Sequence, residues 1–117
     1  VVMWNFQQLF YFFDAHKIIM KVFYLPEVAD FVEKLSYQEH TRLTRIRKLF
    51  EEYSFQIGGK YIKKITASGI WELKAGRIRL FLYIKGDRAA GVHIIRKKSQ
   101  KLTIRDIKLA EKRSKQL

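Results

Sequence analysis

The chain has 117 residues, 48% of them hydrophobic and 15% aromatic, which is enough apolar material for one small domain with a single core. It contains no cysteine and three scattered histidines, which excludes a disulfide framework and a thiolate metal site. The net charge of +13 is large for this length and indicates a polyanionic partner. We therefore expect a cytoplasmic protein without metal or other cofactor.

The excess of cations over carboxylates lies in the second half of the chain. The first 59 residues are neutral overall, whereas residues 60–95 carry eight cations against two carboxylates. Residues 96–117 carry nine cations against two carboxylates. A segregated basic region is typical of nucleic-acid binding, whereas evenly mixed charge would indicate solubility alone.

Residues 1–19 are aromatic-rich but match neither an export signal nor a membrane span. They lack a basic start and a small-residue cleavage site, and five polar residues interrupt the apolar run: Gln7, Gln8, Asp14, His16 and Lys17. Two interpretations stay open, an extra element packed on the domain or an extension upstream of a natural start at Met20. We divide the chain into this segment and one domain of residues 20–117, and expect no membrane partner.

The first elements of the domain are a strand and two helices. Residues 21–25 are β-rich, and Pro26 follows where the first turn of a helix tolerates proline. Apolar residues at spacings of three and four predict one amphipathic helix up to Leu35 and a second over residues 43–53. We expect the two helices to form an α-hairpin that ends before Gly58.

From Lys60 the apolar period changes to two, which predicts strands. In residues 77–85 one side is aliphatic and the other carries cations and aromatic rings. Gly86 and Asp87 form a turn signal leading to a partner strand at 89–95, and residues 70–74 form a third antiparallel strand.

The last predicted element is a helix that begins at a capping signal. Thr103 and Asp106 have the spacing of a capping box, and apolar residues at 104, 107, 109 and 110 continue the helical pattern. The order strand, two helices, three strands and helix predicts an α+β fold with the helices on one face of the sheet.

Two stretches of the basic half carry a family resemblance. They are Gly69-Ile-Trp-Glu-Leu-Lys74 and His93-Ile-Ile-Arg-Lys-Lys-Ser-Gln-Lys101, with Arg79 and Tyr83 on the strand between them. Together they resemble the HigB-like, phage-derived branch of the RelE/ParE toxin superfamily of type II toxin–antitoxin systems, from Met20 to the C-terminus. The resemblance implies a RelE/ParE-like α+β fold, in which an N-terminal strand and an α-hairpin pack on a small antiparallel sheet with a C-terminal helix.

The same resemblance implies an activity and a partner. The activity is ribosome-dependent endonucleolytic cleavage of messenger RNA, and the partner is a cognate antitoxin, expected to be a helix-turn-helix protein. RNA cleavage without a metal needs proton transfer and stabilisation of charge on the phosphate. His93 has the chemistry for proton transfer, and Arg79, Lys97 and Lys64 are the candidate phosphate stabilisers.

Further residues of the basic half are predicted to bind RNA, and we expect their side chains to converge with the catalytic candidates on one surface of the sheet. These residues are Lys60, Lys63, Arg77, Tyr83, Arg96, Lys98, Gln100 and Lys101.

Structural alternatives stand beside several of these assignments. His93 is equally compatible with a strand histidine bonded to the backbone, whereas Trp71 fits a core anchor better than a platform on which a base stacks. Glu72 is compatible with a structural partner of a nearby cation, and Arg113 with a solvated helix end. The chain also departs from the family pattern, because it lacks a tyrosine near its C-terminus and has Ile94-Ile95 where relatives often have Gly-Phe.

Two further functions stay open on the same fold. One is a ParE-like inhibitor of DNA gyrase, and the other is a non-catalytic RNA-binding module or decayed toxin. Translation-linked RNA cleavage would distinguish the nuclease from both.

Overall fold

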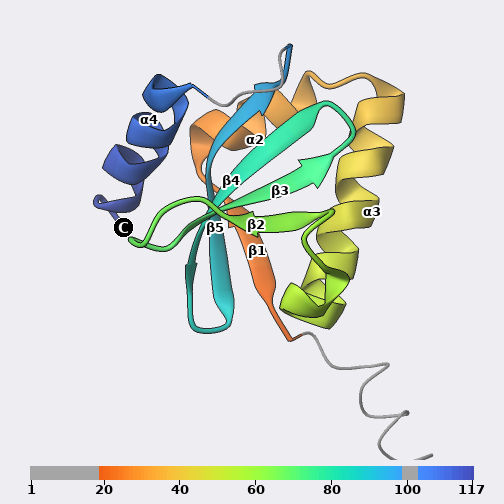
Figure 1. Cartoon of the computed structure of the whole chain (residues 1–117). Helices are drawn as coiled ribbons and strands as arrows, with labels where there is room; N and C mark the ends of the chain where they lie inside the picture. Colours follow the sequence, from red (N-terminus) through yellow and green to blue (C-terminus); the bar gives the residue numbers. More distant parts are fainter. Residues whose placement is uncertain (1–18, 99–102) are drawn as a thin grey trace, which may run out of the picture.

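The computed structural model describes residues 19–98 and 103–117, which form three α-helices, one 3-10 helix and five strands (Figure 1). In chain order the elements are β1 Lys21–Tyr24, α2 Pro26–Glu33, α3 Tyr37–Tyr53, η1 Ser54–Ile57, β2 Ile62–Lys64, β3 Ile70–Ala75, β4 Ile78–Lys85, β5 Arg88–Arg96 and α4 Ile104–Ser114. The prediction of an N-terminal extension concerns residues that lie, apart from Ile19, outside the described part.

All five strands belong to one mixed sheet in the order β1-β5-β4-β3-β2. The predicted antiparallel set β3, β4 and β5 forms its centre. At one edge β1 pairs in parallel with β5, and at the other edge the short strand β2 pairs antiparallel with β3. The predicted α+β fold is confirmed, and it is compatible with a RelE-like fold.

Helices α2 and α3 cover one side of the sheet, which we call the α3 face. Pro26 begins α2, and the apolar positions of both helices, including Val28, Leu43 and Phe50, are buried against the strands. The sheet contributes the aliphatic side of its central strands: Leu73, Ala75, Ile78, Leu80, Leu82 and Ile94. This main core forms as the alternation of residues 77–85 predicted, because aliphatic side chains removed from water stabilise the packed layers.

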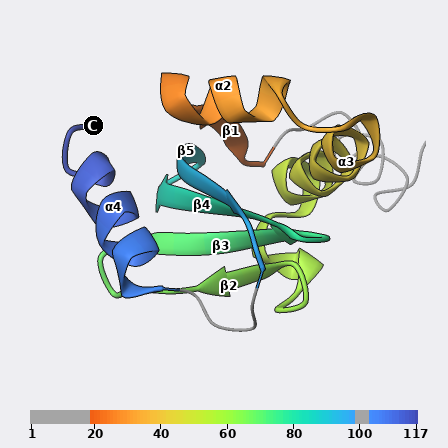
Figure 2. The same cartoon turned by 90° about the horizontal axis from the view of Figure 1, so that it is seen from above.

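Helix α4 covers the opposite side, which we call the α4 face (Figure 2). A second buried cluster lies there, formed by Ile70, Phe81, Ala90, Val92 and Ala110. The prediction that all helices share one face is therefore wrong. Phe81 is also fully buried rather than part of an open cationic and aromatic surface, because Ala110 of α4 packs in the same cluster as its ring.

A β-bulge in β5 decides which face His93 occupies. Phe81 of β4 pairs with His93, and the next residue Leu82 pairs with Gly91, so Val92 is the extra residue. Ala89 belongs to the core of the α3 face, and strict alternation from it would turn His93 to that same face. The bulge shifts the alternation by one and places His93 opposite Phe81 on the α4 face.

The start of α3 offers a first test of the fold. Ser36 accepts a hydrogen bond from the Glu39 amide, and the Glu39 carboxylate accepts one from the Ser36 amide, which is a complete capping box. We expect Ser36→Ala to lower the free energy of unfolding by about 1 kcal/mol, because an amide of the first turn loses its acceptor. Urea unfolding measures this loss, and Ser36→Asp, which keeps an acceptor, is the matched control. Equal losses in the two variants would contradict the capping role.

Candidate active site

His93 is held on the α4 face by two side chains of α4. Its Nε2 atom lies 2.9 Å from Asp106 Oδ1, and its Nδ1 atom lies 3.4 Å from Arg113 Nη1. Because a carboxylate accepts and a guanidinium donates, a neutral His93 in this arrangement carries its proton on Nε2. Arg113 also donates to the Val92 carbonyl at 2.9 Å. The side chain of His93 is 13% exposed, so it is neither open to solvent nor sealed under aliphatic residues.

Asp106 owes its position to the cap of α4. Thr103 is the N-cap, and its hydroxyl accepts from the Asp106 amide and donates to the Asp106 carboxylate. Burial raises the pKa of Asp106, but the hydrogen bonds from Thr103 and His93 outweigh burial and hold that pKa below its ordinary value. Asp106 is therefore ionised at neutral pH and can fix the imidazole of His93.

We expect His93 and Asp106 to be coupled energetically. A double-mutant cycle with His93→Ala and Asp106→Ala should give a coupling energy of about 1.5 kcal/mol at pH 7, the usual size for a hydrogen bond to a charged group. Because the folded-state pKa of Asp106 is depressed, its contribution is present above its ordinary value of 3.8 and is lost as pH falls through the folded-state value. Urea unfolding of the four proteins measures the coupling, and a value near zero at pH 7 would refute it.

A buried carboxylate and a guanidinium stand beside this cluster. Glu72 is 3% exposed and occupies the same cross-strand row as Phe81 and His93. Arg79 follows in the next row, with its Nε atom 4.0 Å from Glu72 Oε2. Within the part of the chain that the structure describes, neither of these two atoms has a hydrogen-bond partner.

The rest of the Arg79 side chain is fixed by backbone. Its Nη1 atom donates to the carbonyls of Gly76 and Ile78, at 2.5 and 3.1 Å. The guanidinium is thus fixed in place while Nε lacks an acceptor. A buried polar atom without a partner costs about 1–3 kcal/mol, so the two unbonded atoms mark this pair as part of a candidate functional site.

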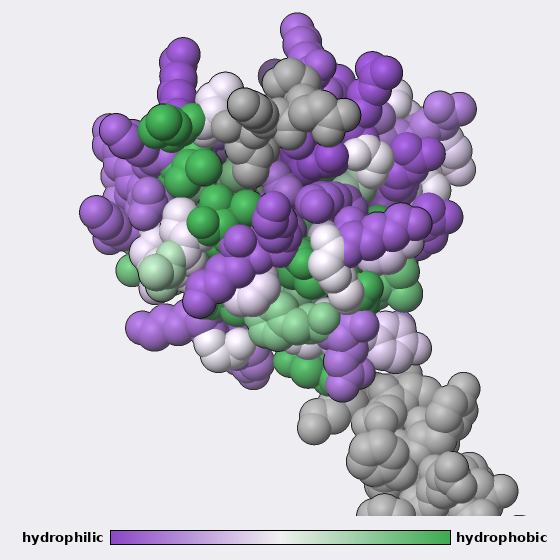
Figure 3. Space-filling model, in the orientation of Figure 1, coloured by the Kyte–Doolittle hydropathy of each residue, from purple (hydrophilic) through white to green (hydrophobic). Residues whose placement is uncertain are grey.

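The structure brings some of the predicted residues together on the α4 face. Arg79, His93 and the partly buried Tyr83 share that face, and Lys63 stands opposite Glu72 in the register of β2 and β3. On the side of the molecule shown in Figure 3, hydrophilic side chains surround a band of hydrophobic residues.

Other predicted residues lie elsewhere, so the expectation of one convergent cationic surface is wrong. Lys64 lies over the ring of Trp71, whose side chain packs with the α3 core, and Arg96 is bonded to Glu39 of α3. Lys60 lies over Tyr61.

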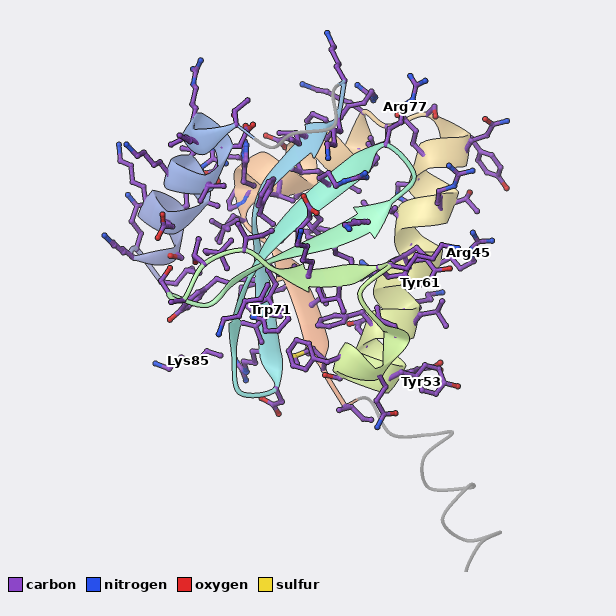
Figure 4. The ribbon with its side chains drawn as sticks, in the orientation of Figure 1. Arg45, Tyr53, Tyr61, Trp71, Arg77 and Lys85 are labelled. Atoms are coloured by element: carbon purple, nitrogen blue, oxygen red, sulfur yellow. The ribbon has the colours of Figure 1, made fainter. Side chains whose placement is uncertain are left out.

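A further group of predicted residues stands at the ends of strands rather than on either face. Arg77 is at the β3–β4 turn, as Figure 4 shows, and Lys97 and Lys98 follow the end of β5. Gln100 and Lys101 lie outside the described residues. Of the candidate phosphate stabilisers, Arg79 therefore lies on the same face as His93, whereas Lys64 does not.

Sequence reasoning missed the part that α4 plays in the site. Arg113 was compatible with a solvated helix end, yet it is half-buried and bonded to β5. A signal was present, because Asp106, Ala110 and Arg113 follow the spacing i, i+4 and i+7 that places them on one side of a helix.

The described part of the chain offers neither a metal cluster nor a membrane-spanning helix. Among residues 19–98 and 103–117, no three His, Cys, Asp or Glu side chains gather where they could hold a metal ion. In the same ranges no helix combines the length and the apolar character that crossing a membrane requires.

Comparison with known proteins places the chain in a family. A search of curated proteins finds no match. The family model described as phage-derived protein Gp49-like (DUF891) matches residues 30–115, which include the end of α2 and all of α3, β2 to β5 and α4. The chain therefore belongs to the Gp49-like family of phage-derived proteins, a RelE-like, toxin-like family.

Proposed function

We propose that this protein is the toxin of a type II toxin–antitoxin system and that it cleaves messenger RNA on the ribosome. The observation that carries the proposal is the Arg79 guanidinium, which is fixed by the β3–β4 turn while its Nε atom faces the buried Glu72 without a hydrogen bond. His93 lies on the same face of the sheet. Membership of a toxin-like family and the charge of +13 support an RNA ligand.

The proposed reaction is an internal phosphoryl transfer. The ribose 2′-hydroxyl loses its proton to a base and its oxygen bonds to the adjacent phosphorus. The bond from phosphorus to the 5′-oxygen of the next nucleotide breaks, and that oxygen takes up a proton. The products are a 2′,3′-cyclic phosphate and a 5′-hydroxyl. Negative charge grows on the phosphate oxygens during this step, and the preorganised Arg79 guanidinium stabilises it.

Glu72 is the positioning residue for Arg79 in this proposal. Its carboxylate is 4% exposed and stands 4.0 Å from the guanidinium, close enough to attract it but too far for a hydrogen bond. The Arg79 side chain is 16% exposed, so its guanidinium can offer a donor other than the buried Nε to a substrate phosphate. A bidentate guanidinium matches the geometry of a phosphate, which a lysine at this position would not reproduce.

His93 serves proton transfer through its Nδ1 atom. The contact of Nε2 with Asp106 is short, whereas the contact of Nδ1 with Arg113 is 3.4 Å. A substrate hydroxyl that displaces Arg113 from Nδ1 meets an acceptor nitrogen already set in the correct tautomer. Asp106 keeps the ring oriented during this exchange.

The antitoxin is part of the same proposal. A toxin with a net charge of +13 is suited to a partner that supplies an acidic segment, because such a segment competes with RNA for the cations. We infer that the cognate antitoxin inhibits the protein by covering the part of the α4 face that carries Arg79 and His93.

Inducible expression with mapping of transcript 5′ ends tests the activity. Expression of the wild-type chain should produce new 5′ ends inside translated regions within minutes, and an antibiotic that blocks translation initiation should abolish them. The His93→Ala chain should produce few such ends while accumulating to the same level. Intact transcripts accompanied by gyrase-dependent DNA breaks would refute the proposal in favour of a gyrase poison.

A further inference from the structure

A polar pocket lies at the tip of the β3–β4 hairpin, beside the first turns of α3. We call it the turn pocket. Its volume is about 170 Å³, and it is lined by Gln38, Glu39, Arg42, Ala75, Arg77 and Ile78. One ordered water needs only about 15 Å³ of such space, so the pocket can hold a phosphate group together with hydrating water. Figure 4 shows Arg77 at the tip of the hairpin, near the start of α3.

The single carboxylate of the turn pocket is already neutralised. Glu39 accepts two hydrogen bonds from Arg96, at 2.6 and 2.9 Å, and one from the Ser36 amide. The hydrogen bonds from Arg96 hold the pKa of Glu39 at about 2, so it stays ionised and paired at neutral pH. Arg42 and Arg77 form no ion pair within the described residues. The pocket therefore offers two arginine side chains whose charge is not compensated.

The Arg42 side chain lies against the turn. A Cβ atom added to Gly76 would overlap Arg42 Nη1, so the guanidinium rests directly on the backbone of this glycine. Gly76 has a φ of +63°, which a glycine adopts without strain.

The same turn connects the pocket with the candidate active site. Arg79 donates to the Gly76 carbonyl, while Arg42 rests on the Cα side of that glycine. The amide of Lys97 donates to the Arg77 carbonyl, which brings the basic end of β5 beside the pocket. A polyanion that contacts Arg79 and continues over the hairpin tip would therefore meet Arg77 and Arg42.

We propose that the turn pocket binds a backbone phosphate of the same RNA strand whose scissile phosphate contacts Arg79. The identity of the ligand rests on the proposed function. A nucleic-acid strand carries a phosphate at every nucleotide, so a strand held at Arg79 presents another phosphate to the neighbouring arginines. Contacts of this kind fix the register of the strand and carry no base specificity.

Binding of a non-cleavable RNA at several salt concentrations tests the pocket. The probe is a fluorescein-labelled 2′-O-methyl RNA, which lacks the attacking hydroxyl, and its anisotropy gives Kd for the full chain. We expect Arg42→Gln and Arg77→Gln each to weaken binding and to reduce the slope of log Kd against log salt by about 0.7, the value for one lost phosphate contact on a single strand. Arg45→Gln is the matched control, because Arg45 is exposed on the same helix but does not line the pocket.

The outcomes separate this inference from the proposed function. A slope reduced in the Arg42 and Arg77 variants but not in the Arg45 variant supports the turn pocket, even if the wild-type chain cleaves no RNA. Equal effects of Arg42→Gln and Arg45→Gln, an unchanged slope, or a wild-type chain that does not bind the probe would overturn it. If the Arg42 and Arg77 variants bind RNA normally but no longer bind a poly-glutamate peptide, the inference is also overturned, and the pocket is assigned to an acidic protein. Thermal unfolding confirms that each variant is folded.

Discussion

Replacing Arg79 by alanine should lower the rate of translation-linked RNA cleavage by about two to three orders of magnitude. Losing one preorganised donor to a developing oxyanion typically has an effect of this size. Arg79 is the only predicted phosphate stabiliser that the structure places on the α4 face with His93 in the described residues. The measurement is the single-turnover rate of cleavage of an end-labelled messenger RNA by excess toxin on purified ribosomes.

A paired design keeps this prediction independent of folding. Removing Arg79 alone leaves the buried carboxylate of Glu72 without its neighbouring charge, which can cost about 3–5 kcal/mol. The double variant Glu72→Gln/Arg79→Gln removes both charges, keeps the size of the first side chain and keeps a shorter polar side chain at the second position. We expect it to be folded and inactive, whereas Glu72→Gln alone should retain part of the activity because the guanidinium remains. A folded double variant that cleaves at the wild-type rate would exclude Arg79 from the reaction.

Phe81→Ala should lower the free energy of unfolding by about 4 kcal/mol, within the usual range for a buried phenylalanine. Its ring is fully buried between the sheet and α4, and its centroid lies 5.4 Å from that of His93. The loss should be accompanied by faster amide hydrogen exchange in α4, because the ring belongs to the cluster on which this helix packs.

The matched control for Phe81 is Tyr37→Ala. Tyr37 is an aromatic residue of similar size that is 85% exposed at the start of α3. Its replacement should change the free energy of unfolding by no more than about 0.5 kcal/mol. Urea unfolding compares both variants with the wild type. A loss below about 1 kcal/mol for Phe81→Ala would show that α4 does not depend on this cluster.

The main core could be predicted from the sequence, and the second layer could not. The alternation of Ile78, Leu80 and Leu82 identifies a buried face directly, because aliphatic residues at every second position need a cover. Phe81 shares its side of the strand with cations, and this pattern favoured the prediction of an open surface. Its burial depends on a helix that begins about twenty residues later in the chain, and alternation within one strand carries no information about such a partner.

The arrangement of the candidate site could be predicted from the sequence only in part. Arg79 and His93 are neighbours as expected, but His93 reaches that face through the bulge at Val92, which strict alternation does not reveal. Side chains alternate between the two faces along a strand, and this alternation places Lys64 and Arg96 on the α3 face. The role of Asp106 was concealed because its spacing from Thr103 also explains it as a cap residue, and both roles are present.

The chemical ends of the RNA products test the central claim most directly. Purified protein, ribosomes and a defined messenger RNA are incubated, and the fragments are analysed for their terminal groups. We predict a 2′,3′-cyclic phosphate on the upstream fragment and a 5′-hydroxyl on the downstream one, formed by the wild-type chain and lost in the Glu72→Gln/Arg79→Gln variant. Fragments ending in a 3′-hydroxyl and a 5′-phosphate, or no fragments with a folded wild-type chain, would contradict the account.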